Sequence, residues 1–159
     1  MTFTRKTVRD YEYLAAGHRW LIPEFHLIAF DDGEEAVPQD EIERVHRAIA
    51  NEICGSPDPL TFDELEFLAD TARMSLADVA RVLQVHRSTI TKWRGSGAVS
   101  RGVFSAALKR HFWFELFGEA LRGQQIPVEV LGSEPALLSF IHDQAIGGDQ
   151  ADRVTRVAA

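Results

Sequence analysis

Residues 75–93, with the sequence SLADVARVLQVHRSTITKW, are the most informative part of this chain. It holds two short helical patterns separated by a break at QVHR, and its positive charge lies in the second half. Ser75 is a candidate N-cap for the first helix, and the second helix begins near His86 and runs to the glycines of RGSG, residues 94–97. The pair is either an ordinary helical hairpin or a DNA-reading helix-turn-helix.

The apolar residues of this stretch have the spacing of two helices that cross at a steep angle. Ala80 lies where the second helix passes, and only a small side chain fits there. Gln84 lies where such turns usually place a glycine, so we expect it to adopt a left-handed conformation at some cost. We expect the crossing to be filled by Val79, Ala80, Leu83, Val85, Ile90 and Trp93.

The outward residues of the second helix are typical of a recognition helix. Arginine reads guanine edges, hydroxyls contact bases or phosphates, and lysine contacts phosphate. The predicted base-reading residues are Arg87, Ser88, Thr91 and Lys92, and the predicted phosphate contacts are Thr89, Arg94 and Arg101. A helical hairpin with a solvated basic face is the alternative.

The charge of the chain is unevenly distributed. The net charge is −7, yet residues 24–70 hold fourteen acidic residues against two arginines, a net of −12. Residues 75–113 hold one acidic residue against seven basic ones, a net of +6. The distribution therefore permits a nucleic-acid partner that the total charge argues against.

The rest of the chain surrounds this pair with further helices. HRWLIPEFHLIAF, residues 18–30, predicts one or two short strands, and Ile42, Val45, Ile49 and Ile53 predict an amphipathic helix from Asp40. Thr61 and Glu64 form a capping-box pattern for the next helix. From Ser100 a long stretch is apolar on nearly every side, which predicts a buried helix.

We therefore predict a mainly α fold. Residues 38–122 form a five-helix helix-turn-helix domain, preceded by a small N-terminal α/β or β-hairpin segment over residues 1–37. A C-terminal extension follows over 123–146, with an edge strand at 126–132 and a short helix from Ser133. We expect the small, polar tail over 147–159 to be disordered.

The aromatic block HFWFELF, residues 111–117, has two interpretations. It closes the domain core, or it forms a dimer or partner interface through Phe112, Trp113, Phe114 and Phe117. A two-fold dimer places two recognition helices roughly 34 Å apart on a palindromic operator.

Other chemistry is not supported by the sequence. His18, His26, His46 and Cys54 do not have the short spacings of zinc ligands, so we expect no metal and no cofactor. No phosphate-binding glycine loop and no nucleophile motif is present, so we expect no enzyme. The N-terminus lacks a signal-peptide pattern and no apolar run spans a bilayer, which predicts a cytoplasmic protein without a membrane partner.

HRSTITKW, residues 86–93, is similar to the SRSTISRW pattern of Xre/Cro-type helix-turn-helix domains. Residues 38–95 resemble the C-terminal domain of MqsA/YgiT-type antitoxin regulators, in which a helix ending in IA..I precedes LT..E..FL and the DNA-reading pair. Two features depart from that pattern: no cysteine precedes Cys54, which removes the zinc-binding module, and Arg94 replaces the usual acidic residue.

The resemblance implies a dimeric DNA-binding protein that represses its own operon as the antitoxin of a neighbouring toxin. With the outward residues of the second helix, it predicts a sequence-specific regulator that binds double-stranded DNA as a homodimer, with a cognate toxin as a further partner. The alternative is a protein-interaction module, an antitoxin or adaptor with little or no DNA binding.

Overall fold

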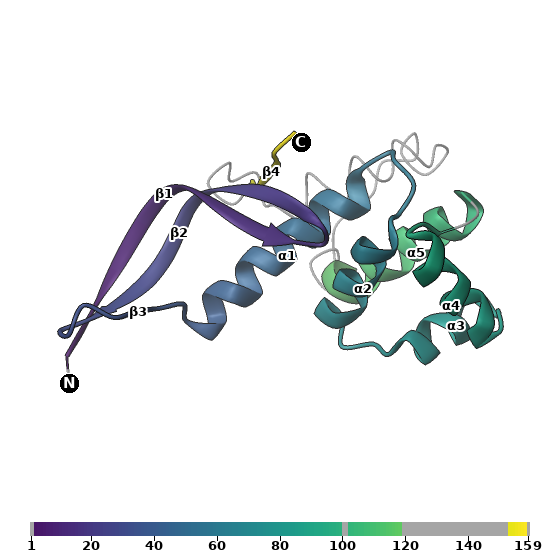
Figure 1. Ribbon diagram of the computed structural model, residues 1–159, viewed down its shortest axis with the longest axis horizontal. Helices are drawn as coiled ribbons and strands as arrows, with labels where there is room; N and C mark the ends of the chain where they lie inside the picture. Colours follow the sequence, from purple (N-terminus) through teal and green to yellow (C-terminus); the bar gives the residue numbers. More distant parts are fainter. Residues whose placement is uncertain (1, 100–101, 119–152, 159) are drawn as a thin grey trace.

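The computed structural model describes residues 2–99, 102–118 and 153–158 (Figure 1). A long β-hairpin lies at one end, four helices are grouped at the other, and α1 runs between them. In chain order the elements are β1 (Phe3–Ala15), β2 (His18–Phe30), β3 (Glu35–Ala36), α1 (Gln39–Gly55), α2 (Phe62–Thr71), α3 (Leu76–Leu83), α4 (Arg87–Ser96), α5 (Gly102–Phe117) and β4 (Thr155–Arg156).

The fold is α+β, and the prediction of a mainly α chain is wrong. The described strands form a four-stranded antiparallel sheet in the order β1-β2-β3, with β4 also paired to β2. The sequence predicted one or two short strands, whereas β1 and β2 each contain 13 residues. β1 has the sequence FTRKTVRDYEYLA, which is polar and mostly exposed. The sequence of β1 lacks the apolar alternation of a half-buried strand. Its strand conformation therefore comes from pairing with β2.

The turn of the hairpin also lacks the usual sequence signal. Ala15 pairs with His18, so the loop consists of Ala16 and Gly17, with φ values of 55° and 75°. Two-residue hairpin loops with positive φ at both positions favour Asn-Gly or Asp-Gly, because most side chains are strained there. Ala16 adopts this conformation although alanine is not a residue that predicts it.

Polar contacts attach the hairpin to α1. The buried carboxylate of Glu41 accepts hydrogen bonds from the backbone N–H of His26 and from Arg44. Arg44 also donates to the carbonyl oxygen of Glu24 at 2.7 Å. These contacts satisfy backbone groups along β2 and fix the start of α1 beside the strand.

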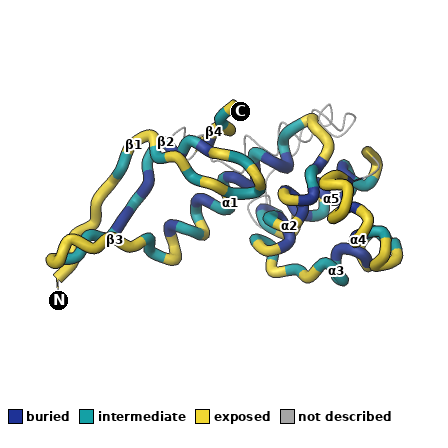
Figure 2. Tube along the Cα trace, in the orientation of Figure 1, coloured by how far each residue is buried: buried dark blue, intermediate teal, exposed yellow. Residues whose placement is uncertain are grey.

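The apolar face of β2 supplies the hairpin's share of the core. Trp20, Ile22, Phe25 and Leu27 are buried, and the ring of Phe25 is stacked on Tyr11 at 4.2 Å between centroids. Exposed residues prevail at the outer end of the hairpin, where β1, β2 and β3 reach beyond the helices (Figure 2). The hairpin is therefore half buried along α1 and half solvated beyond it.

The C-terminal residues differ from the expected disorder wherever the structure describes them. β4 pairs with β2 at Trp20 and Leu21, and the N–H of Val157 donates to the carbonyl oxygen of Arg19 at 2.8 Å. Val154 is buried. These residues are ordered because they pair with an edge of β2. Their own composition does not predict that pairing. The predicted extension over 123–146 lies outside the described residues.

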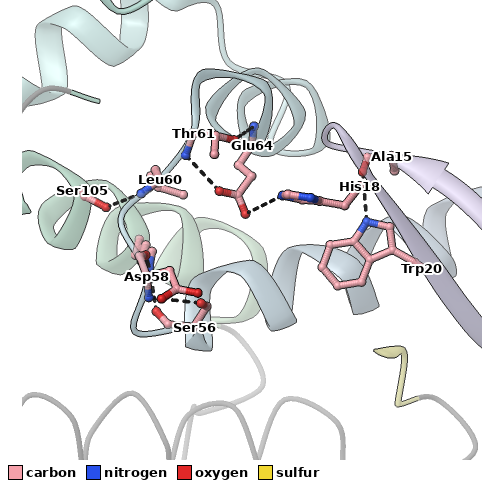
Figure 3. Close-up of polar contacts among 10 residues, drawn as sticks. Ala15, His18, Trp20, Ser56, Asp58, Leu60, Thr61, Glu64 and Ser105 are labelled. Carbon is pink, nitrogen blue, oxygen red and sulfur yellow. Dashed lines mark hydrogen bonds and ion pairs between the residues drawn. The ribbon is translucent and has the colours of Figure 1, made fainter. Parts of the chain in front are cut away.

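The hairpin turn and the helices meet at a buried polar junction (Figure 3). Glu64 accepts the backbone N–H of Thr61 at 2.9 Å, and its second oxygen lies 3.6 Å from Nε2 of His18. The hydroxyl of Thr61 accepts the N–H of Glu64 at 3.1 Å, which confirms the predicted capping box. The same glutamate thus caps α2 and faces the hairpin.

Candidate nucleic-acid interface

The first helix of the predicted pair, α3, begins with a capping box. Ser75 accepts the N–H of Asp78 at 3.1 Å, and Asp78 accepts the N–H of Ser75 at 2.9 Å. The hydrogen bonds from Ser75, together with the neighbouring Arg81 guanidinium, hold the pKa of Asp78 below its usual value. The only acidic side chain of α3 is therefore engaged at the start of the helix and by Arg81.

The turn between the two helices has the predicted left-handed residue. Gln84 has φ 55° and ψ 40°, and the N–H of Val85 donates to the carbonyl oxygen of Ala80 at 3.0 Å. This is the backbone pattern of a helix end that usually carries glycine. The left-handed conformation of Gln84 is strained, and it turns the backbone from α3 into α4.

The six apolar residues expected at the crossing lie on the inner side of the pair. Val79, Ala80, Ile90 and Trp93 are buried, whereas Leu83 and Val85 are half buried and pack against the core. Trp93 is 1% exposed, and its ring lies 5.8 Å from that of Phe104 on α5. The packing therefore fixes which side of α4 faces solvent.

His86 has a role that the sequence analysis missed. Its Nδ1 accepts the backbone N–H of Ser88 at 3.1 Å and lies 2.9 Å from the Ser88 hydroxyl, so the imidazole caps α4. A neutral ring that accepts at Nδ1 carries its proton on Nε2. The signal was weak because serine, threonine, aspartate and asparagine are the usual N-caps.

The predicted base-reading residues share one exposed surface of α4. All four side chains of this set are exposed: Arg87, Ser88, Thr91 and Lys92. The Thr91 hydroxyl donates to the carbonyl oxygen of Arg87 at 3.3 Å, and the Ser88 hydroxyl contacts His86. Arg87 and Lys92 are therefore the members whose charged groups form no hydrogen bond or ion pair among the described residues.

The predicted phosphate contacts are dispersed. Thr89 is half buried, Arg94 is exposed, and Arg101 lies outside the described residues. The guanidinium of Arg94 lies 5.5 Å above the ring of Phe62, the first residue of α2. This cation–π contact holds Arg94 at the end of α4.

Backbone contacts lock the end of α4 onto the start of α2. The N–H of Phe62 donates to the carbonyl oxygen of Gly97 at 3.0 Å, and the N–H of Val99 donates to that of Leu60 at 3.1 Å. Gly97 closes α4 with φ 76°, a conformation that suits glycine. Both ends of α4 are thus held in place, by the His86 cap at its start and by these backbone contacts at its end.

Most of the aromatic block on α5 belongs to the core. Phe112, Trp113 and Phe117 are buried, and Phe114 is 56% exposed. This burial favours the core interpretation of the block over the interface interpretation for three of its four candidates. Phe114 is the one candidate whose ring is available to a partner.

The basic block is less basic at the surface than its sequence indicates. Lys109 is buried, and its ammonium donates to the carbonyl oxygens of Ser56, at 2.6 Å, and of Asp58. Burial lowers the pKa of Lys109, and the nearby Glu64 opposes that effect. This lysine holds the loop before α2, so it adds nothing to an exposed basic surface.

Among residues 2–99, 102–118 and 153–158, no three His, Cys, Asp or Glu side chains are grouped as metal ligands. No helix in those same ranges is both long and apolar enough to cross a membrane. Comparison of the chain with protein-family models, curated proteins and solved structures found no match.

Proposed function

We propose that this chain is a sequence-specific DNA-binding transcriptional regulator without enzymatic activity. One observation carries the proposal: α4 buries Ile90 and Trp93 and leaves Arg87 and Lys92 exposed. A helix that reads DNA must be anchored from below and present short polar or long basic side chains outward. α4 meets both requirements.

The charge around α4 supports a polyanionic partner. α4 contains no acidic residue. The carboxylate of Asp78 on α3 is paired with Arg81 and engaged in the Ser75 cap. Phosphate oxygens approaching the α4 surface would therefore meet cationic side chains and hydroxyls.

We assign base reading to Arg87, Ser88, Thr91 and Lys92. Arg87 makes the bidentate contact with a guanine edge, because its guanidinium carries paired donors. Thr89, Arg94 and Arg101 contact phosphates and set the position of α4 in the major groove. The Arg94 guanidinium is suited to this role since the Phe62 ring limits its freedom.

The protein acts in the cytoplasm as a homodimer on a palindromic operator and represses its own operon. The resemblance of residues 38–95 to MqsA/YgiT-type regulators supports this biological setting. It also names the further partner, a toxin protein that the antitoxin neutralises.

A protein-interaction module with little or no DNA binding is the second candidate. The observation that favours it is the acidity of residues 24–70, which include the exposed side chains of Asp31, Asp32, Glu34 and Glu35. The salt dependence of binding distinguishes the two candidate functions. The affinity of a protein that contacts phosphates falls steeply as the salt concentration rises, whereas that of an apolar protein interface changes little.

The test is a gel shift of the purified protein on its own upstream region at low and moderate salt. The Arg87→Ala/Lys92→Ala variant should lose the specific shift. Arg19→Ala/Arg156→Ala removes the same number of charges from the paired strands β2 and β4 and should keep the shift. Absence of a shift for the natural protein at both salts would reject the DNA-binding proposal and favour the interaction module.

A further inference from the structure

β1 has an unpaired backbone edge in the described part of the chain. From Phe3 to Ala15 it pairs with β2, and β3 and β4 both join the sheet through β2. A strand of this length exposes a row of N–H and C=O groups that another strand can pair with.

The two faces of β1 differ. Val8, Tyr11 and Tyr13 are half buried and pack against the core. Arg9 and Glu12 are both exposed, because Asp10, with φ 53°, interrupts the regular alternation of side chains between them. Two of the most exposed large apolar side chains, Phe3 at 59% and Leu14 at 76%, also belong to β1.

The charges of β1 are divided along its length. Its first half carries Arg5, Lys6 and Arg9, and its second half carries Asp10 and Glu12. Lys6 pairs with Glu35, and Glu12 lies 3.8 Å from Arg19. Arg5, Arg9 and Asp10 form no side-chain hydrogen bond or ion pair among the described residues.

We propose that β1 is a homodimer interface at which a second copy of this chain pairs antiparallel, edge to edge. A parallel arrangement would set basic half against basic half, whereas the antiparallel one sets each basic half against an acidic half. Pairing centred on residues 9–12 sets Arg9 of each copy opposite Glu12 of the other. The interface is self-complementary, as a two-fold dimer requires.

We place the dimer interface on β1 because the aromatic block of α5 is mostly buried. Three residues of the aromatic block are buried in the core of one chain: Phe112, Trp113 and Phe117. The block therefore has little exposed apolar surface for contact with a second copy. The dimer itself does not depend on DNA binding. Its use in bringing two α4 helices to a two-fold operator rests on the function proposed above.

Pairing of two strand edges buries a small area, so the dimer dissociates within an accessible concentration range. Sedimentation equilibrium of the natural protein should show a monomer–dimer equilibrium. Arg9→Glu places like charges together at two symmetry-related positions and should raise the dissociation constant about tenfold. Arg9→Glu/Glu12→Arg reverses both signs and should restore most of the natural affinity.

Arg81→Glu makes the same charge change on α3 and should leave the dissociation constant unchanged. Circular dichroism checks that each variant is folded. A monomer at every concentration would overturn the proposal, and would mean that the charges of β1 and the kink at Asp10, with φ 53°, prevent edge pairing. A dimer that ignores Arg9→Glu, or that the double variant fails to restore, would also overturn it. Operator binding by a protein that stays monomeric would reject the dimer interface and leave the DNA-binding function standing. A stable dimer that does not bind DNA would reject the DNA-binding function and leave the dimer interface standing.

Discussion

Gly17 lies directly against Asp63: a β-carbon built on Gly17 would come within 2.7 Å of Oδ2 and 3.2 Å of Cβ of Asp63. The turn of the hairpin therefore rests on the first turn of α2, at the base of the helical group. Gly17 is required there both for its φ of 75° and for the close approach.

Replacement of Gly17 by alanine should lower the free energy of unfolding by about 2 kcal/mol, from left-handed strain and from the displaced Asp63 side chain. Gly33→Ala is the matched control, because Gly33 has φ 88° with no heavy atom within 4 Å of an added β-carbon. Urea unfolding compares the two variants. Equal losses would show that the contact with Asp63 contributes nothing beyond strain.

Gln84→Gly should stabilise the protein by about 0.5–1 kcal/mol, because glycine removes the left-handed strain between α3 and α4. Gln84→Ala keeps that strain and should leave stability nearly unchanged. Thermal and urea unfolding provide the measurement. A destabilised Gln84→Gly protein would contradict the strain and would indicate a contact made by the glutamine side chain.

The stability of the protein should fall as the pH drops below 6.5, in part because of His46. Burial lowers the pKa of His46 from its usual 6.5, while its Nε2 lies 2.8 Å from the hydroxyl of Tyr13. The folded state therefore binds the proton more weakly than the unfolded state, so this contribution is complete above 6.5 and decreases below it. Urea midpoints of the natural protein and of His46→Gln across this pH range measure the effect. An unchanged pH slope in the variant would contradict it.

Cys54 should resist thiol reagents in the folded protein. Burial raises the pKa of its thiol to about 12, so almost no thiolate forms near neutral pH, and the side chain is 0% exposed. Labelling should follow unfolding as denaturant increases. Labelling in buffer at the rate of a small free thiol would show that this part of α1 opens readily.

Arg87→Ala and Arg94→Ala should affect DNA binding differently, on the function proposed above. Loss of Arg87 should cost about 1–3 kcal/mol at one base position and relax the preference there. Arg94 contacts phosphate in that function, so its loss should weaken binding to all sequences alike and lower the salt slope by about one. Binding to a panel of single-base operator variants distinguishes them. Uniform loss for Arg87→Ala would remove it from the base-reading set.

The helical part of this protein is predictable from local patterns in its sequence. Ser75 and Thr61 cap their helices through bonds to residues three positions later, and the spacing of Ile90 and Trp93 selects the inner side of α4. The left-handed Gln84 was also predictable from its place in the turn. These features depend on residues within a few positions of one another, so a local pattern contains them.

The sheet and the distribution of the basic residues depend instead on contacts between residues far apart in the chain. β1 is a strand because β2 lies beside it, and β4 is ordered because β2 offers it a free edge. Lys109 is turned inward by carbonyl groups more than fifty positions away, at Ser56 and Asp58. Pairing partners and buried acceptors distant in sequence leave no periodic pattern in the chain. Their effect is present only once the backbone has brought them together.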